Sequence, residues 1–242
     1  MRAAVGAGLA ALALLAAGCG GGGEAEAEAG TPVAPVAGLP APAAGRVLLR
    51  FVEAANRRDA AGMWALLSPQ TKETMGPTLP EFRRGLAVDL RNGVATFDTR
   101  PRVVLSRRIG RWAVAAVAGD RVLDDGDEEP FAYGAALRDV GGRWLVELGG
   151  IAIAVPRPAP NDEEDATPTL GAELDASGPL VRALLWRDAE PQPAERVQGG
   201  PFSATIREDV TEPLSAGVHV VTVFATTPDT AAASAWTFEV VD

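Results

Sequence analysis

Apolar residues recur every three or four positions between residues 42 and 91, a spacing typical of helices that pack by one face. The first stripe of such residues is Val47, Leu48, Phe51 and Val52. Start signals for further helices follow at Asp59 and Ser68, and residues 78–81 (TLPE) fit a capping box. Because an Asn-Gly pair at residues 92–93 is a typical helix end, the pattern predicts three helices that finish there.

Beyond residue 102 the apolar positions alternate with small or polar ones, as they do in β-strands. Segments beginning at Val103, Trp112 and Phe131 predict three strands. A turn at residues 139–142 (DVGG) predicts a hairpin into a fourth strand, and Gly149-Gly150 predicts a kink before a last strand at residues 151–155. This half of the chain is therefore expected to be α+β, with helices first and a meandering sheet after them.

Residues 169–242 contain only short apolar segments, separated by turn signals at intervals of roughly ten residues, which is typical of a β-sandwich. The core of this sandwich is expected around Trp186, Phe224 and Trp236. Alternating prolines at residues 156–160 and the acidic run at 161–165 predict a solvated linker between the two halves.

The first 41 residues show neither pattern. The run at residues 3–17 is almost wholly Ala, Leu, Val and Gly, and it is shorter than the roughly 20 residues of a membrane-spanning helix but suits the apolar region of a secretory signal. Residues 20–41 are rich in Gly, Pro and Ala and predict a flexible tether. The expected organisation is a signal peptide (1–18), a tether (19–41), a first domain (42–157), a linker (158–168) and a second domain (169–242).

The end of the signal, Ala16-Ala17-Gly18-Cys19, resembles the lipobox of bacterial lipoproteins. In that family the cysteine thiol receives a diacylglycerol, the signal is cut before the cysteine, and the new N-terminus is often acylated. The resemblance implies a protein held by lipid on Cys19 at the extracytoplasmic face of the bacterial cell membrane. The alternative is an ordinary signal peptide cut at an A-x-A-like site, with Cys19 incidental.

Composition narrows the function classes. The 242 residues include one cysteine and one histidine, which excludes a disulfide framework and leaves little room for multi-cysteine zinc sites or a Ser-His-Asp triad. The formal net charge of -10 argues against nucleic-acid binding. The charge is uneven: residues 42–157 carry 17 basic and 14 acidic side chains, and residues 158–242 carry 4 and 15. This difference predicts that the first domain faces an anionic membrane.

Residues 51–72 (FVEAANRRDAAGMWALLSPQTK) and 138–148 (RDVGGRWLVEL) resemble the nuclear transport factor 2-like (cystatin-like) superfamily. The resemblance implies a cone-shaped domain in which three helices precede a curved antiparallel sheet, often around a pocket. The residues expected to line that pocket are Trp64, Phe82, Trp112, Tyr133 and Trp144. The alternative is that these aromatic side chains simply fill the core.

Residues 214–225 (LSAGVHVVTVFA) and the later AWTFEV segment resemble the last two strands of a bacterial immunoglobulin-like domain. In that resemblance His219 stands where a corner tyrosine usually sits, so a structural role at a backbone turn is expected for it. Such domains in bacterial surface proteins are generally spacers or binding modules.

These features predict a non-enzymatic, lipid-anchored envelope protein that binds or scaffolds, with no cofactor and no metal. Its partners would be the membrane, through lipid on Cys19, and an envelope protein or wall polymer. Two alternatives stay open: a carrier of a small apolar ligand in the cone pocket, and an enzyme in the same pocket that pairs Tyr133 with Asp98 or Asp139. The acidic stretch at residues 124–129 is expected to be a solvated loop and not a calcium site.

Overall fold

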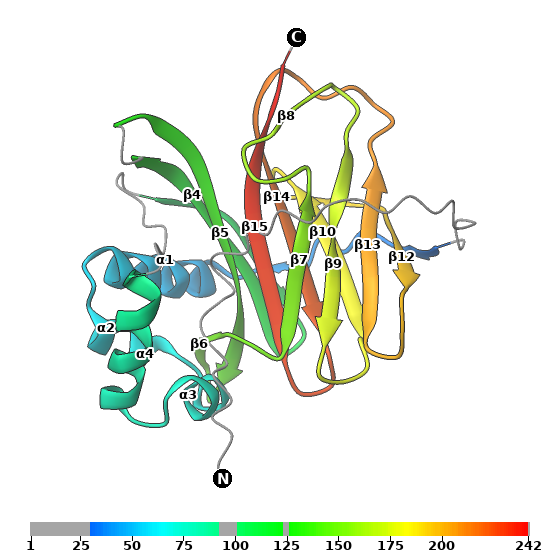
Figure 1. Ribbon diagram of the computed structural model, residues 1–242. Helices are drawn as coiled ribbons and strands as arrows, with labels where there is room; N and C mark the ends of the chain where they lie inside the picture. The colour runs from blue at the N-terminus through cyan, green and yellow to red at the C-terminus, as the bar shows by residue number, and fades with distance from the viewer. Residues whose placement is uncertain (1–29, 92–100, 123–125, 242) are drawn as a thin grey trace.

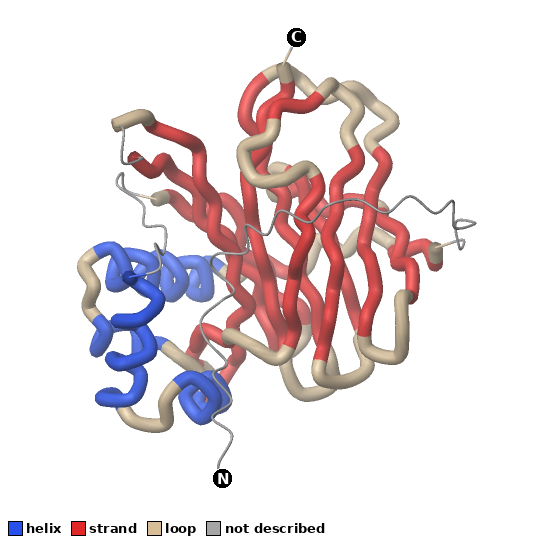
Figure 2. The backbone as a smooth tube through the Cα atoms, viewed as in Figure 1, coloured by secondary structure: helices blue, strands red, loops and turns tan. Residues whose placement is uncertain are grey.

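The computed structural model describes residues 30–91, 101–122 and 126–241, and this part of the chain is mixed α+β and mostly β (Figure 1). It contains four helices and three five-stranded sheets. The helices lie together at one side, and the strands make up the rest of the molecule (Figure 2). We call the sheets the helix-covered, middle and outer sheets, in order of distance from the helices.

The helices follow the predicted start signals, although four helical segments replace the three expected in this region. They are α1 (Pro42–Asn56), α2 (Ala60–Leu66), α3 (Pro69–Met75) and α4 (Leu79–Arg91). The Asp59 carboxylate accepts a hydrogen bond from the Gly62 amide at 2.9 Å, and the Ser68 hydroxyl accepts one from the Thr71 amide at 3.0 Å. Each side chain thereby satisfies an N–H group that a helix start leaves unpaired, so α2 and α3 begin separately.

The helix-covered sheet is antiparallel and has the strand order β2-β3-β4-β5-β6. Its strands are β2 (Leu39–Pro40), β3 (Arg102–Ile109), β4 (Trp112–Val122), β5 (Glu128–Val140) and β6 (Arg143–Glu147). It curls beside the helices (Figure 1). Along β4, Ala113, Ala115 and Val117 pack towards the helices, whereas Val114 and Ala116 pack on the opposite face. Both faces are buried, which explains why β4 reads as one apolar run.

The other two sheets pack face to face. The middle sheet contains β11 (Glu190–Gln192), β10 (Arg182–Arg187), β14 (Gly217–Thr226), β15 (Ala231–Val240) and β8 (Glu163–Glu164). The outer sheet contains β1 (Thr31–Val33), β12 (Ala194–Gln198), β13 (Ser203–Asp209), β9 (Thr169–Ala176) and β7 (Ile151–Arg157). Leu174 and Ile206 of the outer sheet meet Val223 and Trp236 of the middle sheet in one buried cluster.

The middle sheet uses its other face to pack on the helix-covered sheet. Trp186 and Phe224, expected in the core of the second domain, lie instead in the cluster between these two sheets, and their rings meet edge to face with centroids 6.5 Å apart. Alternation along a strand sends neighbouring residues to opposite faces, so Leu185 faces the outer sheet while Trp186 faces away from it. Of the three expected core residues, Trp236 alone lies between the middle and outer sheets.

Three segments do not lie in the parts of the structure to which the predicted domain boundaries assigned them. The strand at residues 151–157, assigned to the first domain, pairs with β9 of the outer sheet. Part of the predicted tether forms β1, which pairs with β12, and β2, which pairs with β3. Within the predicted linker, β8 pairs in parallel with β15. These short segments find partners because sheet edges offer unpaired backbone groups, which their own composition does not reveal.

Candidate functional site

Four of the five predicted pocket residues lie on the helix side of the helix-covered sheet. Phe82 is fully buried in the core cluster, and Trp64, Tyr133 and Trp144 are half-buried against that cluster. Their neighbours in the cluster include Leu48, Phe51 and Leu137. The structure therefore brings these aromatic side chains together around a packed apolar interior.

Trp112 does not line that interior. It lies in the cluster on the opposite face, with Leu105, Ile109 and Trp186. Trp112 begins β4, and side chains one residue apart on a strand point to opposite faces, so Ala113 takes the helix-facing position. The prediction was wrong because β4 is apolar on both faces, and the sequence then gives no sign of which residues face the helices.

Local contacts hold the helix-side tryptophans. The indole N–H of Trp64 donates to the Gly76 carbonyl at 3.3 Å, and the Lys72 ammonium lies 4.2 Å from the centroid of the Trp64 ring. Burial and the nearby Arg143 lower the pKa of Lys72. The Arg108 guanidinium lies 5.5 Å from the Trp144 ring centroid. Such cation–π contacts favour a fixed ring position.

Of the two acid–base pairs considered for an enzyme, the structure describes only Tyr133 and Asp139, and it does not bring these two together. Burial raises the pKa of the Tyr133 phenol, so this group stays protonated at neutral pH. Asp139 lies on the same strand six residues later, which is about 20 Å along the chain. Its carboxylate accepts from the Gly142 amide at 2.9 Å and contacts Arg108 at 3.4 Å. Asp98, the other candidate, lies outside the described residues.

The predicted aromatic residues line neither of two clefts on the surface of the described residues. One, of about 330 Å³, lies between the start of α2 and α4 and is lined by Arg58, Asp59, Ala60, Ala61, Arg83, Leu86 and Ala87. The other, of about 480 Å³, is lined by Val36, Gly38, Leu39, Arg108, Ile109, Gly110 and Arg182. Within the described ranges no group of three or more His, Cys, Asp or Glu side chains could hold a metal ion.

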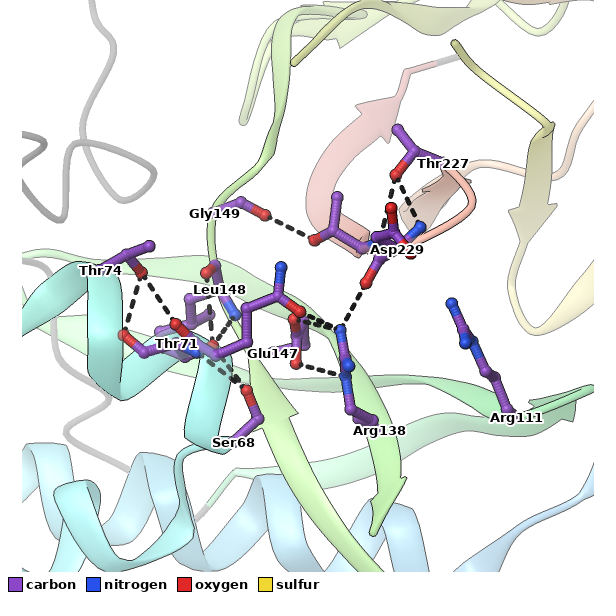
Figure 3. Close-up of polar contacts among 12 residues, drawn as sticks. Ser68, Thr71, Thr74, Arg111, Arg138, Glu147, Leu148, Gly149, Thr227 and Asp229 are labelled. Atoms are coloured by element: carbon purple, nitrogen blue, oxygen red, sulfur yellow. Dashed lines mark hydrogen bonds and ion pairs between the residues drawn. The ribbon is translucent and has the colours of Figure 1, made fainter. Parts of the chain in front are cut away.

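The most extensively connected polar group is Arg138, at the junction of the helices, the helix-covered sheet and the middle sheet (Figure 3). Its Nε donates to Glu147 Oε2 at 3.1 Å, and its Nη2 donates to Glu147 Oε1 at 3.0 Å. Nη2 also donates to the Asp229 carbonyl at 2.5 Å and to the Gln70 side chain. The guanidinium lies 4.6 Å from the Trp112 ring centroid. We call this set of contacts the Arg138 junction.

The burial of Glu147 indicates that the Arg138 junction stabilises the fold. The Glu147 side chain is only 1% exposed, so its charge needs a partner, and Arg138 supplies one with two parallel hydrogen bonds. Because the same guanidinium reaches α3 and the turn between β14 and β15, one side chain ties three elements together. The donors on Nε and Nη2 are committed to these contacts. Sequence reasoning missed the junction, although the isolated Glu147 in an apolar strand was a signal for it.

Further hydrogen bonds reinforce the same region (Figure 3). Thr71 Oγ1 accepts from the Leu148 amide at 2.9 Å, which fixes α3 to the end of β6. Thr230 Oγ1 donates to the Gly149 carbonyl at 3.2 Å, and Arg111 donates to the Pro228 carbonyl. The β14–β15 turn is thus attached directly to the helix-covered sheet.

His219 makes the expected turn contact and one more. Its Nε2 lies 2.8 Å from the Ser215 carbonyl, and its Nδ1 lies 2.6 Å from Asp188 Oδ2. Asp188 Oδ1 also accepts from the Val220 amide at 2.9 Å, and the imidazole stacks on Phe238 with centroids 5.4 Å apart. His219 is 8% exposed. The ring therefore joins two turns of the middle sheet and presents no free nitrogen to a ligand.

Several further sequence predictions fall wholly or partly outside the described residues. They are the signal peptide, Cys19, residues 20–29 of the tether, the Asn-Gly pair at 92–93, and residues 124 and 125 of the acidic stretch. Of the rest of that stretch, Glu129 pairs with Arg121. No helix that the structure describes is both long and apolar enough to cross a membrane.

Comparison with models of known protein families finds no match for this chain, and no curated protein matches it in sequence.

Proposed function

We propose that this protein is a lipid-anchored component of the bacterial cell envelope that binds or scaffolds other envelope components and does not catalyse a reaction. The single observation that carries the proposal is the Arg138 junction, in which the best-organised polar groups join the helices and two sheets. A catalytic group needs a proton or an electron pair free for substrate, and these groups are already paired.

In this proposal the helices and the curled sheet form a nuclear transport factor 2-like cone, and the middle and outer sheets form an immunoglobulin-like sandwich. The order of elements supports the cone, since α1–α4 precede the antiparallel strands β3–β6. The long pairing of β14 with β15 supports the sandwich, because it joins the two segments that resemble its last strands. Buried apolar side chains such as Leu48, Phe51 and Phe82 lie inside the proposed cone, and this supports scaffolding over carriage of an apolar ligand.

The anchor in this proposal is lipid on Cys19, which would hold the chain at the extracytoplasmic face of the cell membrane. Two or three acyl chains bind a bilayer almost permanently, at about 0.8 kcal/mol for each buried methylene. The partner in the envelope would be another protein or a wall polymer.

The test compares the full chain with a Cys19→Ala variant in a bacterial host fed an alkyne-tagged palmitate. We expect label and membrane retention for the natural chain and neither for the variant. Equal membrane retention of the two chains would refute the anchor. Mass spectrometry of the purified folded chain under native conditions tests the binding role, because a bound apolar molecule in stoichiometric amount would favour the carrier instead.

A further inference from the structure

Residues 30–41 form a strap that runs across all three sheets along one side of the molecule. At its start, Thr31 is the Cα partner of Arg196 in the outer sheet, and near its end Leu39 is the partner of Arg108 in the helix-covered sheet. Between these points Val33 packs against the clusters on both faces of the middle sheet. We call the surface along this strap the strap edge, defined by the cleft residues Val36, Leu39, Arg108 and Arg182 and by Val181, which precedes Arg182 in the chain.

The strap edge combines exposed aliphatic side chains with guanidinium groups. Leu39 is 70% exposed and Val181 is 61% exposed, the two largest values among the exposed apolar residues. Leu39, Arg108 and Arg182 line the cleft of about 480 Å³ together with Val36 and Ile109. Exposed apolar residues rimmed by arginine are a feature of surfaces that contact membranes or proteins.

The charges of the strap edge remain available to an anion. Among the described residues no ion pair links Arg182 to a carboxylate. Arg108 donates from Nε to the Gly110 carbonyl at 2.9 Å, and its carboxylate contact among the described residues is with Asp139 at 3.4 Å. Its side chain is 47% exposed. A surface pair of this kind is weak, so it leaves most of the Arg108 charge to neighbouring groups.

The covalent chain brings the strap edge close to the lipid anchor. Cys19 precedes Gly30 by eleven positions (30 - 19), which limits the chain between them to about 40 Å at full extension. A lipid on Cys19 would therefore keep the start of the strap within about 40 Å of the bilayer.

We propose that the strap edge is a docking surface for an anionic phospholipid bilayer. Leu39 and Val181 enter the interfacial layer, and Arg108 and Arg182 bind headgroup phosphates. Because the chain as a whole carries a net charge of -10, an anionic membrane attracts it only through a local basic surface of this kind. The inference rests on the proposed lipid anchor for its location, but the contact itself requires no acyl chain.

This orientation differs from the one that charge alone predicted. The sequence placed the first domain against the membrane and the second domain away from it. The strap edge includes residues of both, since Arg108 belongs to β3 and Arg182 to β10. In this orientation all three sheets would contact the bilayer along the same side of the molecule, and the helices would lie beside the sheets.

The test measures cosedimentation of the chain from residue 19 onwards, carrying Cys19→Ala, with vesicles of phosphatidylglycerol and phosphatidylcholine in equal parts. Vesicles of phosphatidylcholine alone are the lipid control. We expect binding to the anionic vesicles only, weakened by salt. Arg182→Glu should lower the binding constant by roughly tenfold or more, since each basic charge near an anionic surface contributes about fivefold. Leu39→Asp should lower it as well.

Arg84→Glu on α4 is the matched control, because it makes the same charge change at an exposed position of the helical layer. It should leave vesicle binding within about twofold of the parent value, and melting curves confirm that all variants fold. An equal loss for Arg84→Glu, undiminished binding of the strap-edge variants, or no binding to anionic vesicles at low salt would overturn the proposal. None of these outcomes bears on acylation, because palmitate labelling of Cys19 tests the anchor separately.

Discussion

The helix-covered sheet packs its two faces in different ways. Its helix face meets large side chains, including Phe51, Phe82 and Leu48, which fill the space between helices and strands. Its other face meets the middle sheet through large side chains such as Trp112 and Trp186 and, where β5 passes β15, through alanines and Gly134. A Cβ added at Gly134 would lie 2.7 Å from the Ser234 carbonyl carbon. On the helix face large side chains fill the space, whereas around Gly134 small residues let two backbones come close.

This difference predicts that the two faces respond in opposite ways when side chains are made smaller or larger. The helix face should suffer when atoms are removed, because a cavity forms where a large side chain was. The face towards the middle sheet should suffer when atoms are added, because two rigid sheets must move apart to accept them. Phe82→Ala on the helix face and Gly134→Ala on the face towards the middle sheet test that contrast.

Phe82→Ala should produce the largest loss. Phe82 is 1% exposed in the helix-side core, so its truncation removes a buried ring and leaves a cavity. We expect the free energy of unfolding to fall by about 4 kcal/mol in urea titrations. Phe202→Ala is the control, because Phe202 is 45% exposed and its truncation should lower the free energy of unfolding only slightly. Equal losses for the two variants would show that the helix-side core is not closely packed.

Arg138→Ala should cause the second-largest loss of folding stability. It leaves the buried Glu147 carboxylate without its partner and breaks the links to α3 and to the β14–β15 turn. We expect a loss of about 3 kcal/mol, and faster hydrogen exchange of amides in the turn at residues 227–230. Arg84→Ala, on the exposed face of α4, serves as the control. Unchanged exchange in the turn would contradict the assigned role of Arg138.

Gly134→Ala should cost about 2 kcal/mol, although it adds a single methyl group. The added Cβ would lie 2.8 Å from the Ala235 amide nitrogen, within the backbone of β15, so the two sheets must separate slightly. Gly178→Ala is the matched control, since no atom lies within 4 Å of the added carbon there. A neutral Gly134→Ala would mean that the two sheets are loosely apposed.

Val155→Asn should instead stabilise the protein, by about 1 kcal/mol. Val155 has a φ of 46°, a left-handed conformation that a β-branched side chain adopts at a cost and asparagine tolerates. The side chain is 49% exposed, so little apolar burial is lost. Chemical denaturation of the two chains measures the difference. A destabilised variant would show that Val155 makes contacts that outweigh its backbone strain.

The smallest expected effect is a change with pH in the folding stability of Glu208→Gln relative to the natural chain. Glu208 lies on β13, so this substitution probes the outer sheet. Burial raises the pKa of the Glu208 carboxyl despite the Arg187 guanidinium 3.1 Å away, so the folded state holds this proton more tightly than the unfolded state. The carboxyl therefore stabilises the fold in acid, and this contribution is lost as pH rises through its folded pKa. The stability of the variant relative to the natural chain should rise from acidic to neutral pH, and a flat difference would contradict this.

Sequence patterns identified the elements whose signals are local. Asp59 and Ser68 were predicted as helix starts because their side chains cap neighbouring amides, and those hydrogen bonds are present. The Gly-Gly turn before β6 was likewise predictable, since Gly141 and Gly142 have φ values of 61° and 80°. Each of these signals depends only on residues a few positions apart.

Features that depend on distant parts of the chain were not predictable. The partner of β7 is β9 rather than a strand of the helix-covered sheet, and Pro and acidic residues beyond β7 suggested a boundary instead. Trp112 and Trp186 lie in one cluster between the helix-covered and middle sheets. Their orientation was not predictable because both sheets are buried on two faces, which removes the polar alternation that would reveal it. In the Arg138 junction, Arg138 donates to the carbonyl of Asp229, a residue 91 positions away.

We expect the two predicted domains to unfold as one cooperative unit, because the middle sheet packs on both other sheets and the Arg138 junction links the turn between β14 and β15 to β5. Differential scanning calorimetry of the chain from residue 20 onwards, with and without Phe82→Ala, measures this. One transition whose calorimetric and van't Hoff enthalpies agree is expected, with the whole transition at lower temperature in the variant. Two transitions, with Phe82→Ala moving only one of them, would contradict this expectation.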